Sequence, residues 1–184
     1  EPREEQLRQF ENVAERQLLV ALHQLTQGRP FEETLLLEHQ RVSPEQARQL
    51  YLDIATMHQY AVSARAGTIS RISGITFDDY KEKFFSPLEN IIRTELDPYS
   101  KDYSYRTRHA RVAQLVFRQA CQTDELKAAQ FTRIIRGLDF GYSSDSHALE
   151  QITKGRVLAD AFSRPEPVRE IFRSAIAVAP NQAF

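Results

Sequence analysis

Apolar residues recur every three or four positions over most of this chain, which is the spacing that lines one face of an α-helix. Polar stretches, glycine and proline interrupt the pattern. The spacing predicts helices within residues 7–25, 44–60, 64–73, 76–86, 112–117, 126–138, 149–162 and 168–176. The fold class that follows is mainly α.

Local signals mark where several of these helices begin and end. Ser43 precedes Pro44, and Gln46 follows three residues after Ser43, so Ser43 is expected to cap a helix whose first residue is Pro44. Gly74 breaks the next helix. Thr76 begins another capped helix, which runs until Pro87.

The spacing changes to two residues after Pro87. Ile92, Thr94 and Leu96 alternate with charged residues, a turn follows at 97–102, and residues 103–108 alternate again. This pattern predicts a two-stranded hairpin. Because three helices followed by a hairpin is the order of a winged-helix unit, we expect a winged-helix-like unit here.

The predicted elements divide the chain into three parts. We expect a helical linker region at 1–42, a winged-helix-like domain at 43–121 and a helical region at 122–184. The last part consists of paired helices that are typical of the start of a solenoid-like array of helical hairpins. The chain begins inside a charged amphipathic helix and stops at an apolar pair, which predicts a piece of a longer polypeptide.

Composition limits the expected binding partners and the cellular compartment of the protein. The formal net charge is -1, so no global field attracts the chain to nucleic acid or to an anionic membrane. The single cysteine, Cys121, excludes an internal disulfide framework and fits a reducing compartment. Neither a signal peptide nor an apolar run of ~18 residues is encoded. We therefore expect a cytoplasmic protein without a membrane span.

No complete catalytic constellation is encoded. The glycines are scattered singly and no P-loop sequence occurs. Asp139-Phe140-Gly141 matches a kinase motif, but its partner motifs are missing, and we expect a helix-ending turn with Gly141 in the left-handed conformation. Cys121 lies among core residues, and the histidines are dispersed. We expect neither catalytic residues nor a metal site in this chain, which is therefore not an enzyme by itself.

His109 is the strongest candidate for binding. It follows the second predicted strand and opens the next helix, with Arg108 and Arg111 beside it. A helix N-terminus with a histidine and arginines suits a phosphate group. Spacing alone favours the other interpretation, a capping or packing histidine with solvated arginines.

The hairpin is locally basic, and many winged helices bind DNA. The basic residues are Arg93, Lys101, Arg106, Arg108 and Arg111. The helix that would enter a DNA groove carries the acidic residues Asp78, Asp79, Glu82 and Glu89, which offset Lys81 and Lys83. Backbone phosphates would therefore be poorly neutralised, which makes nucleic acid an unfavoured partner.

Several phrases of the sequence resemble the segment that follows the nucleotide-binding core in bacterial STAND NTPases, which are large signal-transduction switch proteins. Two of these phrases are Phe84-Phe85-Ser86-Pro87-Leu88-Glu89 and Tyr105-Arg106-Thr107-Arg108-His109-Ala110-Arg111-Val112-Ala113. Others lie at 14–22, 51–55 and 64–71. The resemblance covers most of the chain.

The resemblance implies a winged-helix arm followed by the start of a tetratricopeptide-like helical region. In that family a P-loop core precedes the arm, helical repeats act as the sensor, and an effector is attached. Related proteins place a histidine at the end of the strand pair, where it touches the phosphate of bound ADP. His109 matches this position, with Arg108 beside it. Ala110 stands where a histidine-aspartate motif has aspartate.

The implied function is that of a non-catalytic regulatory segment. It would couple the nucleotide state of the adjacent P-loop core to the repeat sensor of the same polypeptide in antiviral defence or stress signalling, with homo-oligomers forming on activation. ADP or ATP would be held by the parent protein and not by this chain alone. Two alternatives remain: a winged-helix DNA-binding regulator and a helical protein-interaction scaffold.

Overall fold

The computed structural model of the chain describes residues 31–96 and 101–180, which belong to two compact units, Glu1–Arg41 and Val42–Phe184. The helix predicted at 7–25 lies outside the described residues. Within the first unit, one helix is described, α3 (Phe31–Arg41). Everything that follows concerns the second unit.

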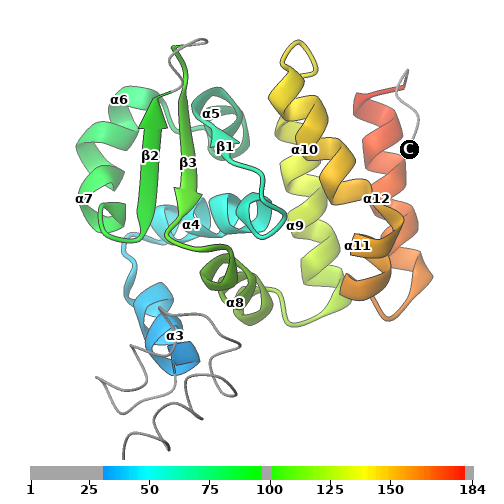
Figure 1. Cartoon of the computed structure of the whole chain (residues 1–184), viewed down its shortest axis with the longest axis horizontal. Helices are drawn as coiled ribbons and strands as arrows, with labels where there is room; N and C mark the ends of the chain where they lie inside the picture. The colour runs from blue at the N-terminus through cyan, green and yellow to red at the C-terminus, as the bar shows by residue number, and fades with distance from the viewer. Residues whose placement is uncertain (1–30, 97–100, 181–184) are drawn as a thin grey trace, which may run out of the picture. The chain divides into compact units, whose positions relative to one another are not determined.

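The winged-helix order of elements opens the second unit (Figure 1). It comprises α4 (Glu45–His58), β1 (Ala64–Arg65), α5 (Ala66–Ser73), α6 (Phe77–Asp79), the π-helical η1 (Tyr80–Phe84), α7 (Phe85–Leu88), β2 (Ile92–Leu96) and β3 (Tyr103–Thr107). The predicted mainly α class and the predicted hairpin are confirmed. In the antiparallel hairpin, Ile92 pairs with Thr107 and Leu96 pairs with Tyr103.

The sheet has a third strand that the sequence pattern did not predict. The strand order is β1-β3-β2, and β1 pairs antiparallel with β3 through Ala64 opposite Tyr105 and Arg65 opposite Ser104. A strand of two residues is too short to show a period of two. Its place in the sheet is set by pairing with a distant segment, which is a tertiary effect.

Helix ends follow the local signals only in part. The Thr76 hydroxyl accepts a hydrogen bond from the backbone N–H of Asp79 at 3.1 Å, so the predicted cap is confirmed. Gly74 ends α5 at φ 70°, where glycine avoids the steric cost of a side chain. The cap expected from Ser43 is wrong: α4 begins at Glu45, Pro44 takes the N-cap position, and this helix start has no side-chain cap.

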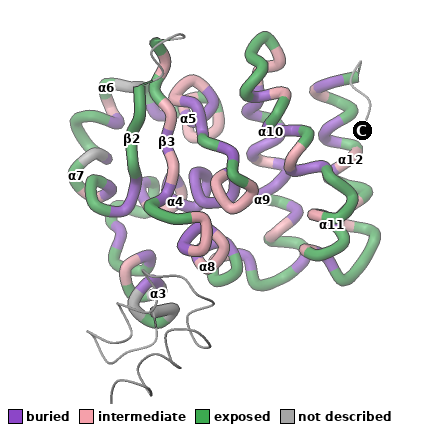
Figure 2. The backbone as a smooth tube through the Cα atoms, viewed as in Figure 1, coloured by how far each residue is buried: buried purple, intermediate pink, exposed green. Residues whose placement is uncertain are grey.

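Helix α4 is the centre of the winged-helix part. Nine of its residues are buried, because it packs against β3, α5, α8 and α9 (Figure 2). Strand β3 packs on α4, and its Tyr105, which is 2% exposed, has its ring 4.8 Å from the ring of Tyr80 in η1. The hairpin thus acquires the core that two strands alone lack.

The rest of the unit is helical. It contains α8 (Ala110–Ala120), α9 (Asp124–Gly137), α10 (Ser143–Thr153), α11 (Gly155–Ala161) and α12 (Pro165–Val178). The single helix predicted over 149–162 is wrong, because Lys154 takes φ -54° and ψ 126°, which interrupts the helical hydrogen bonds between α10 and α11. Helix α9 packs on α4 and α5 on one side and on α12 on the other.

Helices of the described ranges 31–96 and 101–180 include none that is long and apolar enough to cross a membrane.

Candidate functional site

His109 lies between β3 and α8, as the sequence predicted. It is the N-cap of α8, with extended backbone, and its Nδ1 accepts a hydrogen bond from the backbone N–H of Arg111 at 3.1 Å. The imidazole is exposed. The capping interpretation of this histidine is therefore correct, but the cap occupies only one of the two ring nitrogens.

The cap also fixes where the ring proton lies. A backbone N–H can only donate, so Nδ1 of His109 must be the acceptor and carries no hydrogen. In the neutral imidazole the hydrogen is then on Nε2. His109 consequently offers an N–H donor away from the helix end, which suits an anionic oxygen such as that of a phosphate.

The arginines beside His109 flank the same helix end. Arg108 is exposed and lies directly before it, and Arg111 is half-buried in the first turn, where it contacts Gln114 at 3.5 Å. Ala110, at the first position of α8, has no side-chain acceptor that could repel a phosphate. The site therefore combines a helix N-terminus, an imidazole N–H and guanidinium groups.

Two residues that sequence analysis missed, Thr107 and His58, hold the backbone of His109 in place. The Thr107 hydroxyl, fully buried, donates to the backbone carbonyl of His109 at 2.9 Å. His58 Nδ1 lies 2.7 Å from the same hydroxyl. Burial lowers the pKa of His58 below its ordinary value of 6.5, and the nearby Arg106 and His109 lower it further. The two histidines are 51 residues apart in sequence, so no local pattern links them.

The hairpin is less basic than its sequence indicates. Arg93 stands directly opposite Arg106 in the strand register, an unfavourable pair of like charges. Arg106 is ion-paired with Glu95 on the neighbouring strand. On the preceding helix, Lys83 is bound to Asp79 at 2.7 Å. These internal pairs remove cationic groups that a DNA backbone would need.

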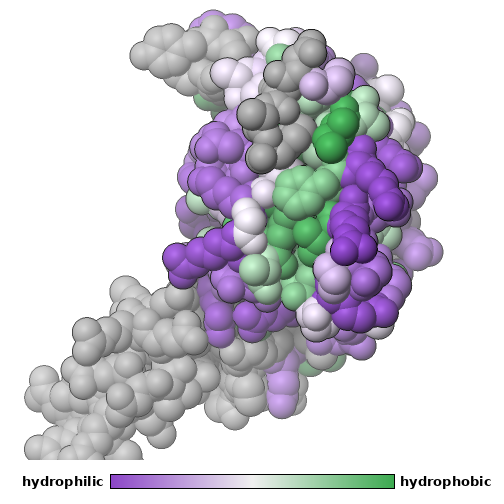
Figure 3. All heavy atoms as spheres, turned by 90° about the vertical axis from the view of Figure 1, so that its right-hand side faces the viewer, coloured by the Kyte–Doolittle hydropathy of each residue, from purple (hydrophilic) through white to green (hydrophobic). Residues whose placement is uncertain are grey.

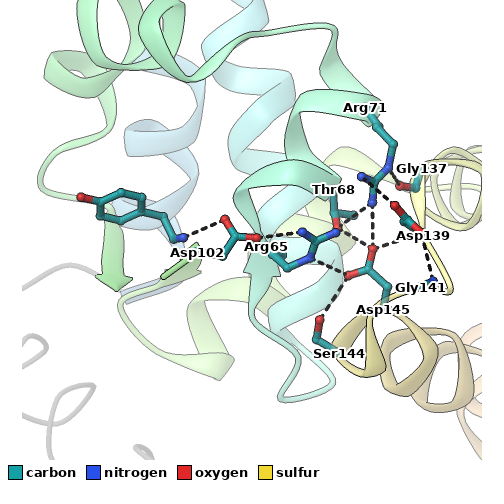
Figure 4. Close-up of polar contacts among 10 residues, drawn as sticks. Arg65, Thr68, Arg71, Asp102, Gly137, Asp139, Gly141, Ser144 and Asp145 are labelled. Atoms are coloured by element: carbon teal, nitrogen blue, oxygen red, sulfur yellow. Dashed lines mark hydrogen bonds and ion pairs between the residues drawn. The ribbon is translucent and has the colours of Figure 1, made fainter. Parts of the chain in front are cut away.

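A buried carboxylate joins the winged-helix part to the helical part. Asp145, in the first turn of α10, has a side chain that is only 2% exposed. It accepts hydrogen bonds from Thr68 at 2.7 Å, from Arg71 at 2.9 Å and from the backbone N–H of Asp139 at 2.9 Å (Figure 4). Thr68 and Arg71 belong to α5, so Asp145 ties α5 to α10.

Arg65 extends this junction to the hairpin. Its guanidinium lies 3.4 Å from Asp145 and 2.7 Å from Asp102, the residue just before Tyr103 (Figure 4). It also stacks on the ring of Tyr142 at 3.4 Å. One arginine therefore contacts both parts of the unit.

The Asp139-Phe140-Gly141 turn belongs to the same junction. Asp139 accepts a hydrogen bond from the Gly141 N–H at 3.0 Å and donates its own N–H to Asp145. The left-handed conformation expected for Gly141 is wrong, since φ is positive at Gly74, Ala61 and Lys101 and not at this glycine. The aspartate side chain closes the turn and makes that conformation unnecessary.

In a second junction the carboxylate comes from the winged-helix part and the arginine from the helical part. Asp53 of α4 is fully buried, and its two oxygens lie 3.1 and 3.2 Å from the guanidinium of Arg133 in α9. Gln130 donates to the same carboxylate at 2.9 Å. The winged-helix part thus supplies a carboxylate to an arginine of the helical part, and the helical part supplies Asp145 to arginines of the winged-helix part.

A groove of about 830 Å³ lies between α5, α9 and α12. Three of its four arginines are already paired with carboxylates of the protein: Arg71 with Asp145, Arg133 with Asp53 and Arg164 with Glu125. Most of its cationic lining is therefore neutralised internally, and we assign it no anion.

The described part of the chain bears on two further kinds of site, a metal site and a reactive thiol. Residues 31–96 and 101–180 contain no group of three or more histidine, cysteine, aspartate or glutamate residues placed to hold a metal ion. Cys121 is buried, as predicted, and burial raises the pKa of its thiol to about 11. A thiol held protonated in this way is a poor nucleophile.

Comparison with known proteins gives no match. No family model, no curated protein and no solved structure matches this chain. The function must therefore be argued from the residues and the geometry.

Proposed function

We propose that this chain is a non-catalytic regulatory segment of a STAND-type NTPase that acts in the cytoplasm. In this proposal it couples the nucleotide state of an adjacent P-loop core to a helical-repeat sensor of the same polypeptide, in defence or stress signalling. His109, with Arg108 beside it, contacts the phosphate of ADP held by the core. Activation releases this contact and allows homo-oligomers to form.

The observation that carries the proposal is the exposed imidazole at the start of α8. Its Nδ1 is occupied by the backbone N–H of Arg111, so a neutral imidazole carries its hydrogen on Nε2, where it can be donated to an external acceptor. A hydrogen bond from this group to a charged phosphate is worth ~1.5 to 3 kcal/mol when water is excluded. A bias of that size shifts a two-state equilibrium by about ten- to a hundred-fold.

The junctions support the coupling part of the proposal. Asp53 joins α4 to α9, and Asp145 joins α10 to α5, so the helical part is tied to the winged-helix part that contains His109. Because each carboxylate is buried and held by several donors, separating the two parts would leave charges unpaired in the interior. In this proposal a displacement at the start of α8 therefore also moves α9 and α10, because the two parts do not separate at the junctions.

The test uses the full-length protein that contains this segment. His109→Ala should accelerate ADP release and lower the activation threshold by about ten-fold or more. His109→Gln, which keeps an N–H donor near the Nε2 position, should retain part of the wild-type behaviour. Arg118→Ala, an exposed position at the other end of α8, is the matched control. Equal ADP release in the alanine variant and in the wild type would overturn the proposal.

One observation favours a second candidate, a helical interaction scaffold. Val168, Phe172 and Ile176 recur every four residues along α12, and Ile176 is 55% exposed. Figure 3 shows apolar side chains gathered on this end of the molecule between hydrophilic borders. In this case Ile176→Glu, and not His109→Ala, would abolish the function of the full-length protein.

A further inference from the structure

The backbone of His109 is anchored to α4 by two consecutive hydrogen bonds. The His109 carbonyl accepts from the Thr107 hydroxyl at 2.9 Å, and that hydroxyl lies 2.7 Å from Nδ1 of His58, the last residue of α4. Thr107 is fully buried. This series of two hydrogen bonds from α4 to His109 is therefore shielded at Thr107 from competing water.

The direction of each hydrogen bond follows from counting hydrogens. A carbonyl oxygen only accepts, so the single hydroxyl hydrogen of Thr107 is given to His109. The hydroxyl oxygen must then accept from His58, which places a hydrogen on its Nδ1. His58 and His109 consequently hold opposite tautomers, with the hydrogen on Nδ1 in the first and on Nε2 in the second.

We propose that His58 is a positioning residue for phosphate recognition at His109, acting through Thr107. The His58–Thr107 pair fixes the carbonyl of His109 where α8 begins, and this holds the N-cap geometry that commits the imidazole to its Nε2–H form. The ligand class, a nucleotide phosphate, rests on the proposed function, whereas the positioning rests on the geometry alone.

The relay does not require a charge on His58. Burial lowers the pKa of His58, and Arg106 of β3 and His109 at the start of α8 lower it further. The neutral form of His58 is therefore favoured, and its Nδ1–H is sufficient as donor. An asparagine side chain can place an N–H near the same point, while leucine cannot.

Tautomers are read directly by long-range ¹H–¹⁵N NMR of the whole chain labelled on histidine nitrogens, at pH 7.5. The expected result is hydrogen on Nδ1 of His58 and on Nε2 of His109. Thr107→Val and His58→Leu should mix the tautomers of His109 and speed amide exchange of Arg111 by about five- to ten-fold, the effect of losing one hydrogen bond. Thr107→Ser and His58→Asn should restore both signals.

A His58 signal with hydrogen on Nε2 overturns the inference, even where a variant fails to fold, because the wild type alone decides it. Unchanged His109 signals in folded Thr107→Val overturn it as well. ADP release from the full-length protein separates the two proposals. If the variants disturb His109 but His109→Ala leaves ADP release unchanged, the positioning stands and the proposed function fails.

Discussion

Truncating Asp145 tests whether the junction between α5 and α10 holds the two parts of the unit together. Asp145→Ala removes an acceptor that is only 2% exposed and leaves the Thr68 hydroxyl and the Asp139 N–H without their partner. Breaking a buried ion pair from one side costs about 3 to 5 kcal/mol. Arg65 keeps Asp102, and Arg71, whose side chain is 37% exposed, keeps the Gly137 carbonyl, so water and other partners relieve part of the loss.

We therefore expect the lower end of that range, about 3 kcal/mol, in the free energy of unfolding. For a unit of this size such a loss lowers the melting temperature by about 6 to 12 °C. Urea unfolding of the whole chain, followed by circular dichroism, measures it. Asp160→Ala is the matched control, because Asp160 is 76% exposed and its ion pair with Arg156 spans 3.9 Å. Its cost should stay below ~0.5 kcal/mol. A cost below ~1 kcal/mol for Asp145→Ala would refute the reasoning.

Three further predictions concern other parts of the unit. Hydrogen bonds from Ser163, in the loop before α12, hold the pKa of Asp124 at about 2, below its ordinary 3.8. The contribution of Asp124 to the stability of the fold is therefore present above pH 4 and is lost as the pH falls toward 2. Asp124→Asn should flatten this part of the acid-unfolding curve. Cys121, with its thiol pKa raised to about 11, should react with a thiol reagent at pH 8 only after unfolding, and rapid native labelling would contradict its burial. Gly137→Ala would set a methyl group 2.1 Å from the Ile72 side chain and should cost about 1 to 3 kcal/mol, whereas Gly155→Ala, in open space, should cost nothing.

The sequence predicted those elements whose signals are local. The alternation after Pro87 identified the hairpin, and Thr76 and Gly74 marked helix ends where the structure has them. The break at Lys154 was missed, because neither this residue nor its neighbour Gly155 interrupts the apolar spacing strongly. Strand β1 was missed for the opposite reason: two residues carry no period, and only pairing with β3 defines the strand.

The candidate site divides in the same way. His109 could be found because a histidine between a strand and a helix is a local signal. The support from His58 spans 49 residues to Thr107, and the junction contacts of Asp53 and Asp145 span 74 to 80 residues to their arginines. A charged residue at a helical position looks solvated in a sequence, and only the fold shows which ones are buried with a partner.

Helix α4 connects these features, which bears on how a phosphate contact could be transmitted. It carries Asp53, which holds α9 through Arg133, and ends at His58, which holds the start of α8 through Thr107. The two positions are five residues apart, about 7.5 Å along one buried helix. Because α4 is packed on several sides, it cannot yield at one of these positions and remain fixed at the other. In the proposed function, a shift of His109 on loss of the phosphate therefore moves α8, α4 and α9 as one body. The same reasoning predicts that Asp53→Ala weakens the coupling without changing the tautomer of His109.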